Sequence, residues 1–271
     1  MRPLAEDINI RRGKYIVGRG NMPNVISVVS GKGGVGKTTF SINFAAALNE
    51  FGHNNVLIDA DVSNPSILLL LQIPHVPLTL QDVLNEGTRI EHAIRVHHTG
   101  LRVVPTSHSM DNRLQLSKLG GAISRLSETV IIDAPPGIDE NIRSILEISN
   151  QVIVVTNPEV PAVTSAVKVI KMAKLLRKNN IGVVINRMRD DPYELIRDEV
   201  EVMCETPIIC TIPEDPAIRK SAFETLPVIY YEPHAPSSVQ FKRLAARLLG
   251  EEYAPPKFLA LRRLFSRFRR K

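Results

Sequence analysis

The sequence lacks several features that define common protein classes. Its 271 residues include no tryptophan and only two cysteines, Cys204 and Cys210. Their spacing is not that of a CxxC pair and no Cys/His cluster stands nearby, so we expect two reduced thiols in a cytoplasmic protein. No apolar run reaches the roughly 18 residues that a membrane-spanning helix needs. The first residues, MRPLAEDINIRRGKYIVGRG, lack the apolar core of a secretory signal.

Acidic residues are missing from one end of the chain. Residues 257–271 contain seven Lys and Arg side chains and no Asp or Glu, whereas the net charge of the whole chain is +6. The rest of the chain, residues 1–256, therefore carries a net charge of −1. A strongly basic protein commonly binds nucleic acid. Here the positive charge belongs to the tail and not to the body.

Short apolar runs alternate with helical patterns along most of the chain. Runs such as VIVVT and GVVIN are uniformly hydrophobic, as in strands that are covered on both faces. This alternation predicts an α/β fold: a doubly wound, mostly parallel sheet with helices on both faces. The expected strands are Val25–Ser30, Asn55–Ala60, Leu101–Pro105, Thr129–Asp133, Gln151–Thr156, Ile181–Asn186 and Ile208–Ile212. The expected main helices are Lys37–Phe51, Ala162–Lys178 and Ser237–Leu249.

Four segments are expected in the chain. Residues 1–22 are polar and basic, which is typical of a loosely ordered extension. Residues 23–250 form one domain, and residues 251–256 are a linker, in which two consecutive prolines stop the last helix of the domain. Residues 257–271 are the basic tail.

Residues 31–39 read GKGGVGKTT, and the first eight of them satisfy GxxxxGK[ST] between an expected strand and an expected helix. In such a loop the backbone N–H groups converge on phosphate oxygens, and the helix adds its positive N-terminal end. Lys37 would place its charge on the β- and γ-phosphates, and the Thr38 hydroxyl would complete a Mg²⁺ shell. The sequence thus predicts a site for ATP and Mg²⁺. The loop residues expected to bind the nucleotide are Gly31, Gly33, Gly34, Val35, Gly36, Lys37, Thr38 and Thr39.

A second lysine, Lys32, directly follows the first glycine of this loop. With it, KGGVGKT resembles the deviant Walker A ATPases, the MinD/ParA family of P-loop ATPases. The resemblance covers roughly residues 23–250. It is narrower for the MinD branch of cell-division and other spatial regulators, which is similar in three places: TNPEVPAV, the run from IPED to LPVI, and the basic tail. It implies that Lys32 is catalytic, reaching across an ATP-sandwiched homodimer to the phosphates of the partner. VSNPSI after Asp61 departs from the usual pattern of the branch, which leaves the activator protein unidentified.

Aspartates follow two of the expected strands. They stand in Asp59-Ala60-Asp61 and in Asp133-Ala-Pro-Pro-Gly, and carboxylates at the carboxyl ends of strands face the ligand crevice of a doubly wound sheet. The resemblance implies that Asp61 orients the attacking water, that Asp59 supports the metal site and that Asp133 holds Mg²⁺ through water. A strand-end aspartate is also a common helix cap, and for Asp59 that alternative is a fair competitor.

Two further segments resemble the parts of the family that contact adenine. They are Asn186-Arg187 and Pro213-Glu214-Asp215. An asparagine amide can both donate and accept hydrogen bonds along a base edge. The alternative for Pro213–Asp215 is a turn with a helix cap.

The basic tail has an apolar side. On a helical wheel five of its large apolar residues fall within an arc of about 120°, and two arginines flank this apolar face. Leu259 is the one large apolar residue that lies off the face. The apolar residues are Phe258, Leu261, Leu264, Phe265 and Phe268, and the flanking residues are Arg262 and Arg269. We expect an amphipathic helix that lies on an anionic membrane surface, similar to the targeting helix of the MinD branch. Packing of this stripe on the domain and binding of nucleic acid are the alternatives.

The combined expectation is an enzyme that converts ATP and water to ADP and phosphate and uses the reaction as a switch. ATP would join two chains, and two tails would hold the membrane about 10²–10⁴-fold more strongly than one. Hydrolysis would return single chains from the cytoplasmic face of the membrane to the cytoplasm. The alternative is a ParA-like DNA-partitioning ATPase, which the near-neutral body and the apolar stripe disfavour. An iron–sulfur carrier would need paired metal-ligand cysteines, and Cys204 and Cys210 lack that spacing.

Overall fold

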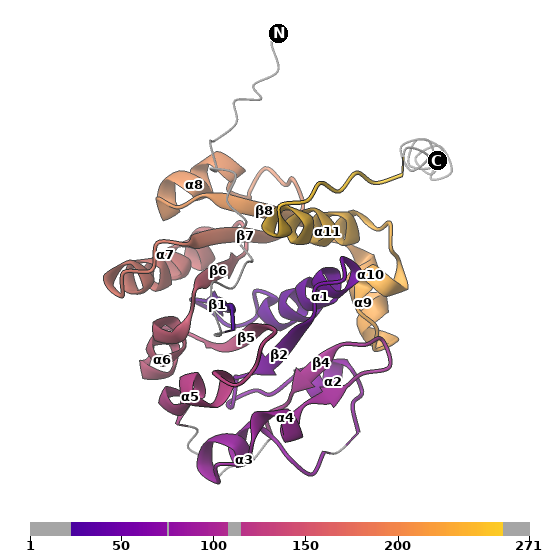
Figure 1. The fold of residues 1–271 in the computed structure, drawn as a ribbon. Helices are drawn as coiled ribbons and strands as arrows, with labels where there is room; N and C mark the ends of the chain where they lie inside the picture. The colour runs from indigo at the N-terminus through magenta and orange to yellow at the C-terminus, as the bar shows by residue number, and fades with distance from the viewer. Residues whose placement is uncertain (1–22, 75, 108–114, 257–271) are drawn as a thin grey trace.

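An eight-stranded sheet forms the centre of the computed structural model, which describes residues 23–74, 76–107 and 115–256 (Figure 1). The strands lie in the order β3-β4-β2-β5-β1-β6-β7-β8. Every neighbouring pair is parallel except β3 and β4, which are antiparallel. The strands are β1 (Val25–Ser30), β2 (Asn55–Asp59), β3 (Arg95–Val96), β4 (Arg102–Val104), β5 (Thr129–Pro136), β6 (Gln151–Thr156), β7 (Ile181–Met188) and β8 (Ile208–Pro213).

Strand β1 is the point at which the strand order reverses. It pairs with β5 on one side and with β6 on the other, so the chain that leaves its carboxyl end can cross to either half of the sheet. In doubly wound sheets the crevice outside the carboxyl ends at such a point is where ligands bind. The loop after β1, residues 31–36, lies at this point.

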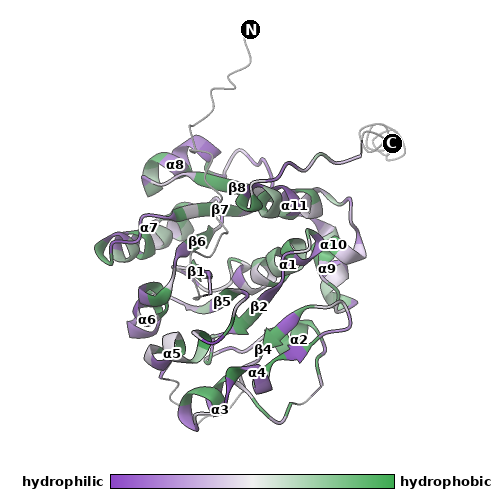
Figure 2. Ribbon diagram, in the orientation of Figure 1, coloured by the Kyte–Doolittle hydropathy of each residue, from purple (hydrophilic) through white to green (hydrophobic). Residues whose placement is uncertain are grey.

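Helices cover both faces of the sheet. The helix after β1, α1, and the last helix, α11, pack together on one face, and α6, α7 and α8 pack on the other. Figure 2 shows the central strands coloured largely as hydrophobic, whereas the helices carry both colours along their length. The helices are α1 (Lys37–Glu50), α2 (Ile67–Leu70), α3 (Leu80–Asn85), α4 (Ile90–Ala93), the 3-10 turn η1 (Leu116–Lys118), α5 (Leu119–Ile123), α6 (Glu140–Ile148), α7 (Val160–Leu175), α8 (Arg197–Cys204), α9 (Pro216–Phe223), α10 (Val228–Tyr231) and α11 (Pro236–Leu249).

The architecture confirms the α/β expectation of a doubly wound, mostly parallel sheet. Each of the seven expected strands is present within a few residues of its expected ends, and so are the three expected main helices. Strand β3 was not expected, because it is only two residues long and its side chains are not buried. It closes the edge of the sheet beside β4 as the one antiparallel neighbour in the described chain.

The segment that follows α11 packs back on the domain. Helix α11 ends at Gly250 with φ +75°, and the Tyr253 ring meets the Phe51 ring edge-on at 6.0 Å. The Nζ of Lys242 lies 5.8 Å from the centre of the Tyr253 ring and pairs with the Glu50 carboxylate at 2.7 Å. The first part of the expected linker, residues 251–256, is thus held against the C-terminal ends of α1 and α11.

Candidate nucleotide-binding site

The loop between β1 and α1 is bent by glycines and opens onto a helix N-terminus. Gly34 and Gly36 have φ values of +80° and +89°, which residues with a Cβ rarely adopt. Helix α1 begins at Lys37 and has no side-chain cap and no acidic residue in its first turn. Its first N–H groups are therefore free of capping side chains and point toward the loop, as an anion site requires.

Gly31 has a different reason to be glycine. A Cβ at this position would lie 2.1 Å from the backbone oxygen of Ser165 and 2.8 Å from the backbone nitrogen of Ala166, both in α7. The loop thus passes directly against the backbone of α7, and no side chain fits between them. Binding of the nucleotide by Gly31 stays a prediction, and its contact with α7 is a separate reason for a glycine at this position.

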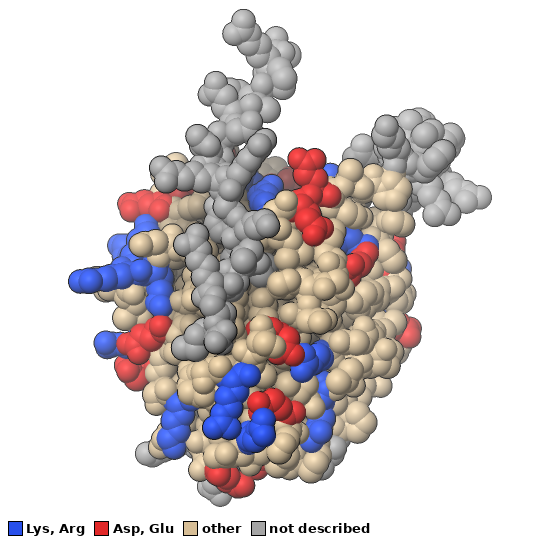
Figure 3. Space-filling view, in the orientation of Figure 1, with Lys and Arg blue, Asp and Glu red and all other residues tan. Residues whose placement is uncertain are grey.

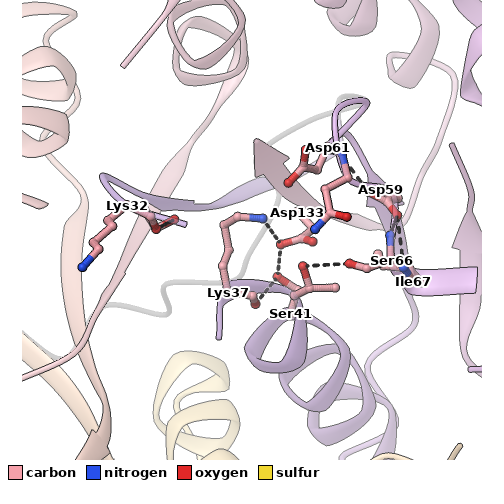
Figure 4. Close-up of polar contacts among 11 residues, drawn as sticks. Lys32, Lys37, Ser41, Asp59, Asp61, Ser66, Ile67 and Asp133 are labelled. Carbon is pink, nitrogen blue, oxygen red and sulfur yellow. Dashed lines mark hydrogen bonds and ion pairs between the residues drawn. The ribbon is translucent and has the colours of Figure 1, made fainter. Parts of the chain in front are cut away.

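Lys37 and Asp133 form a buried ion pair beneath the loop (Figure 4). The Lys37 amine lies 2.9 Å from Oδ1 of Asp133, and these side chains are 6% and 0% exposed. The Ser41 hydroxyl, one turn along α1, donates to the same Oδ1 at 2.9 Å. Oδ2 of Asp133 is buried without a partner among the described residues. The carboxylate thus has one oxygen fully engaged and the other available for a further donor or cation.

Asp59 and Asp61 lie at the end of β2, close to Asp133. The backbones of Asp59 and Asp133 are paired in the sheet, because β2 and β5 are neighbours. Oδ2 of Asp59 accepts hydrogen bonds from the N–H groups of Ser66 and Ile67, both at 3.2 Å. These bonds join Asp59 to the start of α2, so the cap-like contact considered as its alternative is present. The Asp61 carboxylate accepts from the N–H of Asn64 at 3.1 Å and is largely buried.

Burial of the aspartates changes their acidity. Burial, followed by the negative charge of Asp133, raises the pKa of Asp59 to about 7, although hydrogen bonds from backbone N–H groups oppose the shift. Burial also raises the pKa of Asp61, while Lys37 acts in the opposite direction. Three carboxylates share this site with Lys37 as the buried cation among them, so the site favours additional positive charge.

These residues fit a divalent cation. The unpartnered oxygen of Asp133, the Asp59 carboxylate and the nearby Thr38 hydroxyl form an oxygen-rich set, and Mg²⁺ prefers such ligands. The raised pKa of Asp59 shows that negative charge accumulates here, which a cation would relieve. The Thr38 oxygen accepts a hydrogen bond of 3.4 Å from the Ser66 hydroxyl. When bound, Mg²⁺ would neutralise the charge that develops on the phosphate oxygens.

A cavity of about 360 Å³ lies over the loop and is lined by some of the predicted residues. Its walls combine loop residues, residues after β2 and residues after β5. Of the predicted site residues, it is lined by Gly33, Gly34, Gly36, Lys37, Thr38, Thr39, Asp61 and Arg187. Val35 is buried beneath the loop. Asp59 and Asp133 lie buried behind the wall.

Lys32 lies apart from this cavity. Its side chain is exposed and, in Figure 4, its amine points away from Lys37 and Asp133. The backbone oxygen of Lys32 accepts a hydrogen bond of 3.0 Å from the Ser30 hydroxyl, which fixes the loop at this residue. The two lysines of the loop are therefore oriented toward different targets.

The side chain of Asn186 supports the loop from beneath. Its amide Nδ2 donates to the backbone oxygen of Val35 at 2.8 Å, across 151 residues of sequence. A Cβ on Gly36 would lie 2.4 Å from the same nitrogen, so the glycine and the asparagine fit each other. Arg187 follows with φ +59°, and it reaches the cavity wall. The Asn186 amide donor is thus already engaged with the loop.

Asp215 is occupied by the two helices beside it. Its Oδ1 accepts from the N–H of Ala217 at the start of α9, and its Oδ2 accepts from the N–H and hydroxyl of Ser237 at 3.0 and 2.8 Å. The alternative of a turn and helix cap therefore describes the contacts that this carboxylate makes. The Glu214 carboxylate lies 3.9 Å from Arg189, and Pro213 ends β8.

Some functional residues were not expected. Ser41 was missed, although its position four residues after Lys37 places it on the same side of α1. Ser66 was missed because its contacts with Asp59 and Thr38 depend on the path of the chain after β2. The tail residues Phe258, Leu261, Arg262, Leu264, Phe265, Phe268 and Arg269, and the extension of residues 1–22, lie outside the described residues.

The cysteines do not form a metal site in the described chain. Cys204 at the end of α8 and Cys210 in β8 are both free and buried. Burial raises the pKa of the Cys204 thiol to about 11 and that of the Cys210 thiol to about 12. Among the described residues no group of three or more His, Cys, Asp or Glu could by itself hold a metal ion, so a cation at the nucleotide site would need the Thr38 hydroxyl and phosphate oxygens as further ligands. The described chain also has no helix long and apolar enough to cross a membrane.

Comparison with known proteins identifies relatives over nearly the whole domain. A ParA family profile, described as an NUBPL iron-transfer P-loop NTPase, matches residues 21–249. An uncharacterised ATP-binding protein of Methanocaldococcus jannaschii is 35% identical over 237 residues, which cover 86% of this chain and 90% of the relative. The septum site-determining protein MinD of Synechocystis is 31% identical over 263 residues, which cover 92% of this chain and 98% of that protein.

Solved structures agree with this relationship. The cell division ATPase MinD of Pyrococcus furiosus matches with a TM-score of 0.78 and 31% identity, covering 84% of this chain and 98% of that one. MinD of Pyrococcus horikoshii, complexed with Mg-ADP, matches with a TM-score of 0.76 and 29% identity, covering 84% of this chain and 96% of that one. The chain therefore belongs to the MinD/ParA family of P-loop ATPases, which use ATP with Mg²⁺.

Proposed function

We propose that this chain dimerises on ATP and cycles on and off the cytoplasmic face of a membrane to position division or other cellular structures. The observation that carries the proposal is the divergence of the two loop lysines. Lys37 is buried against Asp133 beneath the cavity, whereas Lys32 is exposed and points out of it. One loop thus presents one lysine to its own nucleotide and another to a molecule that faces it.

A second copy of the chain is the partner that fits Lys32. If two loops face each other across their nucleotides, each Lys32 amine comes near the phosphates of the other chain. Charge supplied in trans at that position stabilises the transition state of phosphoryl transfer and ties hydrolysis to the dimer. ATP would then promote dimerisation, and hydrolysis would separate the chains.

Within each chain we assign the remaining predicted residues to the nucleotide. Asp61 orients the attacking water, since its carboxylate is at the cavity wall. Thr38 would complete the Mg²⁺ shell, Asp133 would hold Mg²⁺ through water, and Asp59 would support the metal site. Arg187 lies at the cavity wall on the adenine side, where Asn186 also fixes the loop backbone through Val35.

The basic tail connects ATP to the membrane. Each large apolar side chain that enters the interface contributes about 1.5–3 kcal/mol, and each cation near anionic headgroups about 1 kcal/mol. Ordering a tail of this length costs roughly 1 kcal/mol or more per residue, so a single copy binds weakly. Two copies on one dimer gain avidity of about 10²–10⁴-fold. The tail therefore holds the membrane only while ATP holds the dimer.

Binding of DNA through the same tail is the second candidate, and it rests on the seven cations of residues 257–271. On the face of the body seen in Figure 3, basic and acidic side chains are interspersed rather than separated. Such a surface is not the continuous basic stripe that typically follows a DNA backbone. The five apolar residues on one side of the tail also favour a lipid interface.

Iron transfer, which appears in the description of the family profile, is not part of this proposal. Cys204 and Cys210 lie buried in α8 and β8 and lack the spacing of paired metal-ligand cysteines.

Co-sedimentation separates the two candidates. The full chain is pelleted with anionic liposomes and, in parallel, with duplex DNA, each in the presence of ATP or ADP. We expect pelleting with liposomes in ATP, little in ADP, and loss when residues 257–271 are deleted. Leu261→Glu, on the apolar face, should abolish pelleting, whereas Leu259→Glu, the same change off that face, should leave most of it. Pelleting with DNA alone would overturn the membrane proposal, and equal loss in both glutamate variants would contradict the helix orientation.

A further inference from the structure

A second cavity, of about 330 Å³, lies at the edge of the sheet opposite the nucleotide loop. Its walls are formed where β6, β7 and β8 begin and where α11 ends, and the loop of residues 31–36 follows the other end of β1. We call it the amino-edge groove. Most of its lining is apolar: Val152, Ile153, Ile181, Pro207, Ile209 and Leu248.

The groove exists because this part of the sheet has little side-chain cover. Gly182 in β7 has no side chain, and the Ile209 side chain of β8 folds over it, so that a Cβ on Gly182 would lie 2.7 Å from Ile209. Helix α11 packs on α1 and β8, and at its end the Arg247 guanidinium donates to the backbone oxygen of Ile209 at 3.0 Å. Pro207 and Arg247 are exposed at the rim. The apolar floor is therefore open from one side.

The N-terminal extension joins the domain beside this groove. Asn24 directly precedes β1, and the next residue, Val25, makes two hydrogen bonds with Asn150. The Val25 N–H donates to the Asn150 side-chain oxygen at 2.7 Å, and the Asn150 N–H donates to the Val25 carbonyl at 2.9 Å. The next residue after Asn150, Gln151, lines the groove. The chain before Pro23 thus starts next to one wall of the groove. The family profile begins only at residue 21, so the extension is an addition to the domain that the family shares.

One stretch of the extension matches an apolar groove. Residues 15–17, Tyr-Ile-Val, are the longest apolar run in residues 1–22, and Lys14 and Gly18 border it. The distance from β1 across β6 and β7 to β8 is three strand spacings, about 14 Å in all. The six residues from Val17 to Pro23 span up to about 20 Å when extended, so the apolar run reaches the whole length of the groove.

We infer that Tyr15, Ile16 and Val17 occupy the amino-edge groove of their own chain. Burying these side chains removes the apolar floor from water and fixes the extension against the end of α11. The occupant is chosen by attachment and chain length: the extension joins the domain beside Gln151 of the groove, and its apolar run lies within six residues of Pro23. This inference does not depend on the membrane cycle or on ATP.

Disulfide trapping on the full chain tests the inference. Val17→Cys combined with Asn179→Cys, at the groove, should form an intramolecular disulfide under mild oxidation. Ile8→Cys with Asn179→Cys is the matched control from the same extension and should form much less. Equal trapping in both pairs would overturn the docking of residues 15–17. A disulfide-linked product with the mass of two chains would show that a second copy occupies the groove, which also overturns the inference.

Fluorescence gives an independent readout, because the chain contains no tryptophan. The single indole of Tyr15→Trp should be shielded from acrylamide quenching and emit at shorter wavelength than the indole of Leu4→Trp. Adding Pro207→Glu, at the exposed rim, should remove that shielding and leave the Leu4→Trp signal unchanged. Quenching of Tyr15→Trp equal to that of Leu4→Trp, or insensitive to Pro207→Glu, would contradict the assignment.

Discussion

Gly31→Ala tests whether the nucleotide loop is held against α7 by direct backbone contact. The added Cβ would lie 2.1 Å from the Ser165 carbonyl oxygen, whereas ordinary contacts begin at 3.4 Å. Loop and helix must therefore separate by about 1.3 Å. The atoms that clash belong to the backbone, so no side-chain rotation relieves the contact.

The cost follows from how firmly α7 is held. Its buried residues Ala162, Val163, Ala166 and Val169 belong to the core on that face of the sheet, so the helix cannot withdraw without opening packed contacts. Overpacking of this kind typically costs about 1–3 kcal/mol. A backbone-to-backbone clash belongs at the upper end, so we expect a loss of about 3 kcal/mol in the free energy of unfolding. Domains of this size are typically stable by only about 5–15 kcal/mol, so the change is readily measured.

Urea unfolding followed by far-UV circular dichroism measures this loss, and the absence of tryptophan makes dichroism the natural signal. Gly33→Ala is the matched control in the same loop. Its Cβ would meet only the Pro136 Cγ at 4.0 Å, an ordinary contact, and its φ is outside the left-handed region. Without nucleotide, Gly33→Ala should be neutral or stabilising by about 0.4–1 kcal/mol. If Gly31→Ala unfolds at the same urea concentration as Gly33→Ala, the reasoning about α7 is wrong.

Further predictions concern the charged residues of the site. Lys32→Ala should lower ATP turnover by about 10²–10³-fold and leave ATP affinity in nucleotide titrations unchanged; equal turnover would argue against catalysis in trans. Asp61→Ala should abolish turnover but keep ATP-dependent dimerisation, which light scattering measures, and surviving turnover would assign the water to another group. Asp133→Asn removes the carboxylate that pairs directly with the buried Lys37 amine and leaves only Asp59 and Asp61 near its charge, so unfolding by urea should become easier by about 3–5 kcal/mol; a change near zero would show that the pair is not needed. Burial and Asp133 raise the pKa of Asp59 from 3.8 to about 7, so the nucleotide-free folded protein retains a proton that the unfolded chain loses. The free energy of unfolding should therefore fall as pH rises from about 4 to 7, and an unchanged slope in Asp59→Asn would contradict this assignment.

Much of the fold was predictable because its signals are local. Strands such as β1 and β6 are mostly apolar, fully buried runs, and both coincide with their expected ranges. Their alternation with helical patterns leaves few topologies, because parallel strands need crossover connections. Strand β3 carries no such signal: its two residues pair with β4 only because the chain turns back between them, over residues 97–101.

The candidate site was predictable where motif and topology agree. Lys37, Thr38 and Asp61 line one cavity, with Asp59 and Asp133 behind it, because loops at the carboxyl ends of neighbouring strands meet there. The sequence could not show which partners a side chain hydrogen-bonds with when those partners lie far away in the chain.

Asn186 and Asp215 illustrate that limit. Local sequence shows an amide and a carboxylate that can meet a base, and only the assembled fold shows what each already contacts. The Asn186 amide donates to the loop backbone, and the Asp215 carboxylate accepts three hydrogen bonds from the starts of α9 and α11. The close approach of Gly31 to α7 is equally invisible locally, because it depends on a helix more than a hundred residues away.

Helix α1 has a mechanical consequence. Its first residue is Lys37, paired with Asp133, and its last is Glu50, paired with Lys242, while the adjoining Phe51 holds the Tyr253 ring. Fourteen helical residues at about 1.5 Å each make a rod of about 20 Å. Because no loop interrupts the rod, a displacement of its first turn by a bound nucleotide would reach the contacts that hold residue 253, four residues before the tail.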